Sequence, residues 1–154
     1  MTESIQDKLK SLGITLPQAA APAANYVPWV ISGNQVFVSG QLPMEDGKIA
    51  VAGQLGDNVS LEDGQRAARL CAVNILAQAR AALGDLDRVT RIVRLGGFVA
   101  SADSFTDQPK VVNGASDLMV EVFGDKGRHA RAAVGVNTLP LGVAVEIDAI
   151  IEFA

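Results

Sequence analysis

The chain has 154 residues, of which 49% are hydrophobic and 19% are charged, a balance typical of a folded globular protein. Its formal net charge is −4 and its 13 lysines and arginines are scattered, which argues against a nucleic-acid partner. With a single cysteine and a single histidine, the chain can form neither an internal disulfide nor the usual cysteine or multi-histidine metal sites. We therefore expect no bound metal.

The N-terminus lacks the basic start and apolar core of a secretory signal. No apolar stretch approaches the roughly 20 residues that a membrane helix needs. We expect a soluble, cytoplasmic protein without a membrane partner. Its length favours one domain over residues 1–154, in which residues 1–20 form an N-terminal helical extension.

The first part of the chain predicts a short helix followed by a β-hairpin. Residues 4–12 carry an apolar stripe that ends at Gly13. Residues 26–31 and 35–39 flank a Ser-Gly-Asn turn, and glycine and asparagine tolerate the positive φ of tight hairpins. A further short strand is expected over residues 48–51.

The clearest helix begins after Ser60 and ends at Gly84. Its buried stripe includes Cys71, which we interpret as a small core residue rather than a nucleophile. A strand over residues 89–100 contains Gly96-Gly97, which indicates a bulge or a close backbone approach.

A second amphipathic helix is expected from about Val111 to Val122, followed by two closing strands. We expect these strands to form a hairpin in which Arg131 shares a face with Glu146 and Asp148. The simplest interpretation is an exposed cross-strand ion pair, and the alternative is the anion-binding end of a pocket. His129 is interpreted as an ordinary surface or boundary histidine.

This order of strands and helices predicts an α+β sandwich, with a mixed, mostly antiparallel sheet and two helices on one face. The other face would carry small and apolar groups together with Arg131, Glu146 and Asp148. Nothing else in the chain is left to cover that face, so we expect contact between subunits there.

The residues also resemble a known family, the YjgF-like reactive intermediate deaminases, historically called L-PSP endoribonucleases. Residues 26–27 and the Ser-Gly-Gln-Leu-Pro segment at 39–43 look like the family's first hairpin. Ala130-Arg131, Leu139-Pro140 and Glu146 look like its C-terminal motif at matching separations. The likeness extends from Tyr26 to Phe153.

This resemblance implies a chorismate-mutase-like sandwich that assembles as a homotrimer with ligand clefts between subunits. Characterised members hydrolyse imines or enamines such as 2-aminoacrylate to 2-oxo acids and ammonia, without a cofactor. By resemblance, Arg131 would hold the carboxylate of a small-molecule ligand and Glu146 would position the attacking water. The cleft would further be lined by side chains or backbone of Tyr26, Ser39, Gly40, Asn113 and Ala133.

The chain departs from the deaminase branch at three places, which indicates a divergent branch. Ala133 stands where that branch commonly has a cysteine, the loop before Asn113 is longer, and the N-terminal extension is additional. A non-catalytic trimer that binds small carboxylates or a partner protein therefore remains an alternative function. A ribonuclease is a minor alternative, since an acidic chain suits RNA poorly.

Overall fold

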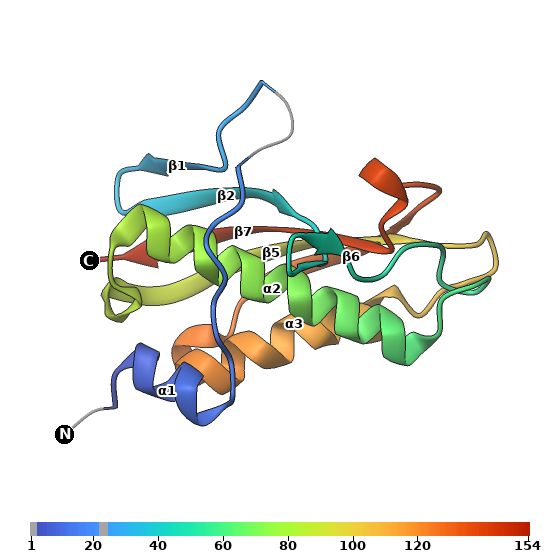
Figure 1. The fold of residues 1–154 in the computed structure, drawn as a ribbon. Coiled ribbons are helices and arrows are strands. Elements are labelled where there is room, and N and C mark those ends of the chain that lie inside the picture. Colours follow the sequence, from blue (N-terminus) through green and yellow to red (C-terminus); the bar gives the residue numbers. More distant parts are fainter. Residues whose placement is uncertain (1–2, 22–24) are drawn as a thin grey trace.

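The computed structural model describes residues 3–21 and 25–154, in which helices cover one face of a β-sheet (Figure 1). The helices of this part of the chain are α1 (Ile5–Ser11), α2 (Leu61–Leu83) and α3 (Gln108–Phe123), with short 3-10 helices η1 (Leu86–Arg88), η2 (Gly124–Gly127) and η3 (Pro140–Gly142). The strands are β1 (Trp29–Ser32), β2 (Gln35–Gln41), β3 (Met44–Glu45), β4 (Lys48–Ile49), β5 (Val89–Ala100), β6 (Ala130–Val136) and β7 (Val145–Phe153).

Helix α2 begins and ends where its sequence predicts. The Ser60 hydroxyl accepts a hydrogen bond from the Asp63 amide, which satisfies one of the free N–H groups of the first turn. The helix ends at Gly84, whose φ of 81° is costly for other residues. Ser4 caps α1 in the same way through the Asp7 amide. These two expected helices are confirmed, as are β5 and α3.

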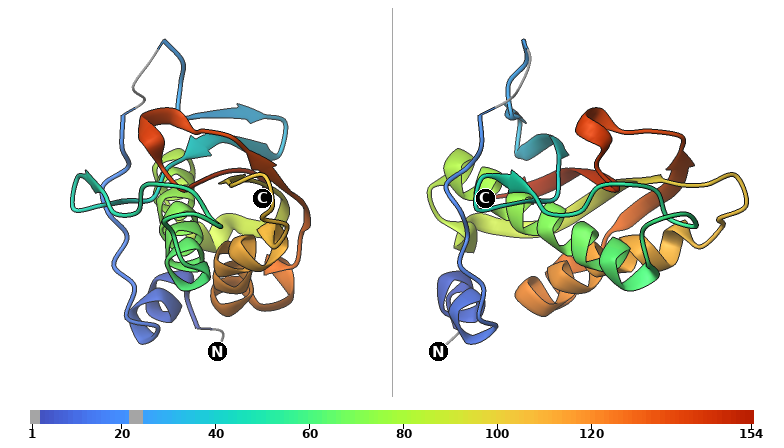
Figure 2. Two further views of the ribbon diagram at one scale, coloured as in Figure 1. Left: turned by 90° about the vertical axis from the view of Figure 1, so that its right-hand side faces the viewer. Right: turned by 45° about the vertical axis from the view of Figure 1, so that its right-hand side comes forward.

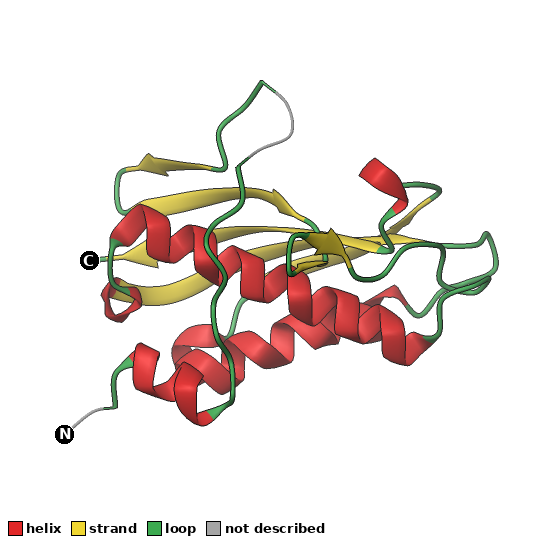
Figure 3. Ribbon diagram, in the orientation of Figure 1, coloured by secondary structure: helices red, strands yellow, loops and turns green. Residues whose placement is uncertain are grey.

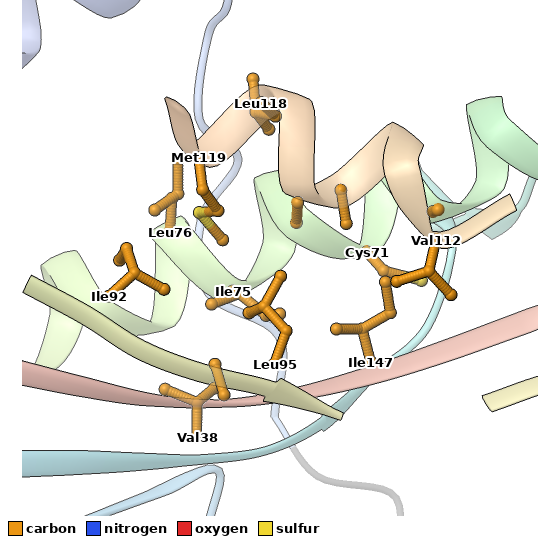
Figure 4. Packing of buried hydrophobic residues seen from close by; sticks show 14 of the residues in the cluster. Val38, Cys71, Ile75, Leu76, Ile92, Leu95, Val112, Leu118, Met119 and Ile147 are labelled. Carbon is orange, nitrogen blue, oxygen red and sulfur yellow. The ribbon is translucent and has the colours of Figure 1, made fainter. Parts of the chain in front are cut away.

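Helices α2 and α3 lie side by side against the same sheet face (Figures 2 and 3). Between helices and sheet lies the core, in which Ile75 of α2 and Met119 of α3 meet Leu95 of β5 and Ile147 of β7 (Figure 4). All four side chains are fully buried, and burial of such side chains contributes about 1.5–3 kcal/mol each. The predicted α+β sandwich is confirmed.

The closing strands do not form the predicted hairpin. The sheet order is β1-β2-β7-β5-β6, so β5 lies between β6 and β7. Strand β6 pairs with β5 in parallel, and the remaining pairs of this sheet are antiparallel. Because α3 connects β5 to β6, the two strands can enter the sheet in the same direction.

The two adjacent glycines of β5 allow close approach rather than a bulge. The register of β5 against β7 shifts earlier in the strand, between Val89 and Arg91 and again between Ile92 and Arg94, and is regular at Gly96 and Gly97. A Cβ atom at Gly97 would lie 2.6 Å from Val112 Cγ2, so α3 packs directly onto this backbone. The close-approach interpretation is confirmed and the bulge is wrong.

The N-terminal segment packs along the helical layer. Leu9 and Leu16 are buried in the same core as the sheet residues. After α1 the chain crosses α2, where Gln78 Nε2 donates to the Ala20 carbonyl at 2.8 Å and Arg80 Nη2 to the Pro17 carbonyl at 3.2 Å. The short strand expected over residues 48–51 is β4, which pairs with β3 outside the main sheet.

Candidate functional site

Arg131 projects from the edge strand β6 toward α3. It is paired in register with Leu95 of β5, which in turn faces Ala149 of β7. Residues in register point to the same sheet face, and Leu95 and Ala149 are buried beneath the helices. Arg131 therefore lies on the helix-covered face, and the expectation that it shares a face with Glu146 and Asp148 is wrong.

The guanidinium of Arg131 is held by three acceptors of α3. Nη1 donates to Asn113 Oδ1 at 2.8 Å and to Ser116 Oγ at 3.0 Å, while Nη2 donates to the Pro109 carbonyl at 3.2 Å. Arginine has five N–H groups, so Nε–H and one N–H of Nη2 have no acceptor among the described residues. No carboxylate of the described residues forms an ion pair with Arg131. The side chain is thus oriented while two donors stay available for an anion.

Ser116 links Arg131 to the chain's single histidine. The Ser116 hydroxyl lies 2.8 Å from His129 Nε2, and His129 Nδ1 lies 2.6 Å from the Gly127 carbonyl. His129 is half-buried, and burial and the nearby charge of Arg131 lower its pKa, opposed by the hydrogen bond to Gly127. The histidine is a boundary residue as predicted, but it belongs to the hydrogen-bond network of Arg131.

Glu146 lies on the opposite, uncovered face, directly over Gly40 of β2. Along the β2–β7 pair, Val38 faces Ala149 and Gln41 faces Ile147, so β2 contains one extra residue there. A Cβ atom at Gly40 would collide with Glu146 Oε2. This bulge and the absent side chain give the Glu146 carboxylate its place on the sheet.

Tyr26 and Ser39 lie beside Gly40. The Ser39 hydroxyl donates to the Val27 carbonyl at 2.8 Å, which fixes the segment before β1 against β2. Tyr26 and Gly40 line one pocket of about 150 Å³ together with Leu141 of η3. Tyr26 is half exposed, and Leu141 is 69% exposed, so the mouth of this pocket is open.

Both carboxylates of β7, Glu146 and Asp148, have raised pKa values. Burial, and then the charge of Asp148, raise the pKa of Glu146. Burial also raises the pKa of Asp148, while Arg94 and the Gly96 amide oppose this shift. Arg94 Nη1 lies 3.7 Å from Asp148 Oδ1, so the ion pair expected on this face exists, but its cation is Arg94 and not Arg131.

The predicted site residues thus form two groups within one chain. The Arg131 group consists of Asn113, Arg131 and Ala133, and the Glu146 group consists of Tyr26, Ser39, Gly40 and Glu146. Ala133 is in register with Gly97 and Ile147 on the helix-covered face. The chain brings together the members of each group and keeps the two groups on opposite faces of the sheet.

The remaining chemistry of the described residues is limited. They contain no group of three or more histidine, cysteine or acidic side chains arranged for a metal. No helix among them has the length and apolar character needed to cross a membrane. Cys71 is fully buried, its Sγ donates to the Val145 carbonyl at 3.6 Å, and burial raises the pKa of its thiol well above the usual value. It is a core residue, as its sequence position predicts.

Sequence reasoning did not find Ser116 and Pro109 as partners of Arg131. Ser116 follows Asn113 by three positions, so both face the same side of α3, one turn apart. That spacing was readable in the sequence. Without the parallel pairing of β6, however, nothing indicated that this helix face meets Arg131.

Comparison with known proteins agrees with this architecture. Residues 6–152 match the family described as "YjgF/chorismate_mutase-like, putative endoribonuclease". The chain is 58% identical to Protein TCP17 of Trypanosoma cruzi over 145 residues, covering 94% of this chain and 91% of that protein.

Two solved structures extend the comparison. The protein Atu1372 of Agrobacterium tumefaciens, described as of unknown function, is 58% identical with a TM-score of 0.92, covering 97% of this chain and 92% of that chain. TdcF of E. coli, solved with bound serine, is 25% identical with a TM-score of 0.67, covering 89% and 94%. By its sequence and its fold, the chain belongs to the YjgF/chorismate-mutase-like family.

Proposed function

We propose that this protein hydrolyses small imines or enamines that carry a carboxylate, of the 2-aminoacrylate type, to 2-oxo acids and ammonia. The observation that carries the proposal is Arg131, a half-buried cation oriented by three acceptors with two N–H groups left for an anion. Nε–H and Nη2–H match the two oxygens of a carboxylate. The serine bound by TdcF has an α-carboxylate of the same kind, which supports this ligand class.

Glu146 supplies the acid–base group. The enamine first becomes the imine, and water then adds to the imine carbon while Glu146 takes one of its protons. The carboxylic acid returns this proton to nitrogen, which gives a carbinolamine. Glu146 then moves the hydroxyl proton to the amino group, the C–N bond breaks as the carbonyl forms, and a 2-oxo acid and ammonia leave. Imine plus water balances with these products, so no redox partner is required. A pKa raised by burial and by Asp148 makes Glu146 a stronger base than an ordinary carboxylate.

The two groups must come from different copies of the chain. Arg131 lies on the helix-covered face of the edge strand β6, and Glu146 lies on the uncovered face of β7, so one chain does not place them around one ligand. In the proposed homotrimer, the Arg131 group of one subunit faces the Glu146 group of the next. The exposed apolar side chains of the uncovered face, Val30, Phe37 and Val134, favour such burial.

The function is tested with 2-aminoacrylate generated in situ by a serine dehydratase, with ammonia and pyruvate followed over time. The protein should accelerate the decay of the intermediate over buffer, and Arg131→Ala should abolish the acceleration while the assembly stays intact. Arg66→Ala is the matched control, because it removes an exposed cation that is already paired with Glu45, away from both groups. This variant should accelerate the decay as the wild type does.

The same experiment separates the alternatives. A non-catalytic binding protein would bind pyruvate in a calorimeter through Arg131 and give no acceleration. A ribonuclease would cleave RNA in a reaction that survives purification and is lost in Arg131→Ala. The net charge of −4 and the scattered positions of the lysines and arginines argue against that outcome, because RNA binding favours a basic patch.

A further inference from the structure

The hydrogen bonds between Gly127 and Arg131 have one consistent direction. A carbonyl oxygen only accepts, so His129 Nδ1 must carry the hydrogen that points at Gly127. In a neutral ring, Nε2 is then an acceptor for the Ser116 hydroxyl at 2.8 Å. The Ser116 oxygen in turn accepts from Arg131 Nη1 at 3.0 Å. Every hydrogen in this chain of contacts has an acceptor.

We propose that Ser116 and His129 are positioning residues for Arg131, and that neutral His129 with its hydrogen on Nδ1 is the state that aims the guanidinium at an incoming carboxylate. The inference rests on the proposed function, in which Arg131 holds that carboxylate. Ser116 and His129 act through Arg131 and do not themselves need to touch the ligand.

The geometry explains why this pair matters. Asn113 and Pro109 hold two N–H groups of Arg131 from one stretch of α3, and Ser116 adds a contact one helical turn later. A serine hydroxyl can rotate, whereas His129 fixes its hydrogen and leaves the oxygen lone pairs for Arg131. Without His129, the Ser116 hydroxyl could rotate, and its oxygen would no longer be held as an acceptor for the second N–H of Arg131 Nη1.

The charges around His129 favour its neutral form. Arg131 is the charged group whose effect on the His129 pKa is resolved, and it lowers that pKa. The other charged residues on the elements packed against His129 are Asp125, Lys126 and Arg128 at η2, Lys110, Asp117 and Glu121 on α3, and Arg91 and Arg94 on β5. Five of these eight residues form ion pairs: Asp125 with Arg128, Glu121 with Arg69, Arg94 with Asp148, and Lys110 with Asp107.

The test uses the full chain with isotope-labelled histidine, because a single histidine makes its ring nitrogens directly assignable by NMR. The spectrum of the neutral ring should show Nδ1 protonated and Nε2 unprotonated. Ser116→Ala should raise the His129 pKa, because it removes a donor that stabilises the neutral ring. Arg131→Gln should also raise it, because it removes a neighbouring cation.

Two further variants serve as controls. Ser116→Thr keeps a hydroxyl at this position and should restore the His129 pKa toward that of the wild type. Asp117→Asn changes an exposed charge on the neighbouring position of α3, and loss of an anion should shift the pKa downward or leave it unchanged. A ring with its hydrogen on Nε2, or a His129 pKa that is unmoved by Arg131→Gln, would overturn the proposal.

Ligand binding gives a second, independent readout. Ser116→Ala should weaken binding of pyruvate by roughly five- to tenfold, as expected for about one hydrogen bond. The same change should have no further effect in the Arg131→Gln background, since the pair acts through Arg131. Additive losses in the double variant would contradict a positioning role. If the wild type binds no carboxylate and gives no turnover, the proposed function fails, while the NMR spectrum still decides whether Ser116 and His129 orient Arg131.

Discussion

At the scale of single residues, the reactivity of the site depends on the pair of carboxylates on β7. Burial and the charge of Asp148 raise the pKa of Glu146, so the base becomes protonated at a higher pH than an ordinary glutamate. Turnover should therefore decline as the pH falls through this raised pKa. Asp148→Asn removes the repelling charge and should move the acid limb of the kcat/KM profile to lower pH.

The control for this profile is Glu152→Gln, which changes an acid on the same strand further from Glu146, beside Thr90. Its acid limb should match that of the wild type. An Asp148→Asn profile that does not move, or that moves to higher pH, would argue against Glu146 as the base.

The same raised pKa has a consequence for stability. Because the folded-state pKa of Glu146 lies above its unfolded value, the fold favours the protonated carboxyl and bears a cost when it is ionised. At a pH above the folded-state pKa, Glu146 is ionised in folded and unfolded chains alike, and Glu146→Gln should raise the melting temperature while abolishing turnover. This gain should shrink as the pH falls through the folded-state pKa. A lower melting temperature in the higher pH range would mean that the ionised carboxylate stabilises the fold.

At the scale of elements, α3 is the part of the fold that holds Arg131, and it crosses α2 at Gly114. A Cβ atom there would collide with the backbone carbonyl of Gln65. Replacing glycine by alanine inside a helix ordinarily stabilises by about 0.5–1 kcal/mol. Here the added methyl meets backbone, so Gly114→Ala should instead destabilise by roughly 1–3 kcal/mol.

Urea unfolding measures this effect, with an unchanged slope showing that the unfolding reaction is the same. The variant should also weaken carboxylate binding, since Asn113 and Ser116 flank the crossing and both contact Arg131. A Gly114→Ala chain that is more stable than the wild type would show that the helices do not depend on this close contact.

The elements also show what could be predicted from the sequence. Helix α2 was predictable because its caps, Ser60 and Gly84, are local signals. The pairing of β6 was missed, because the alternation of its side chains looks the same whether the strand pairs with β5 or with β7. The strand–helix–strand order of β5, α3 and β6 is itself a sign of parallel pairing, and it outweighs the short connection between β6 and β7.

For the candidate site, the wrong pairing of β6 led to a wrong prediction of which residues lie together. Arg131 and Glu146 were both selected as site residues, but only the sheet register places them on opposite faces. Ser116 and His129 were missed for the same reason, since their contacts with Arg131 depend on α3 lying over β6. Local sequence motifs identified candidate site residues, whereas the long-range pairing of strands determines which of these residues are in contact.

For the whole molecule, the proposed activity requires assembly of several chains. The uncovered sheet face exposes Val30 by 50%, Phe37 by 41% and Val134 by 45%. Light scattering should give a mass near three times the 16.0 kDa of one chain. Phe37→Glu, which places a charge on this face, should lower that mass and abolish turnover together. Leu61→Glu charges an exposed apolar residue of α2, outside the sheet, and should change neither. A monomeric wild-type protein would remove the site that the proposal needs.

A ligand cleft shared between subunits is tested most sharply by complementation between two inactive variants. Arg131→Ala lacks the carboxylate clamp and Glu146→Gln lacks the base, so each variant alone should be inactive. If the Arg131 group and the Glu146 group come from neighbouring subunits, unfolding and refolding the two variants together in equal amounts should restore about a quarter of the wild-type activity, because that share of the clefts receives both intact residues. No recovery in mixed assemblies, with their mixed composition verified by mass, would place both residues in the same chain's site and rule out a cleft shared between subunits.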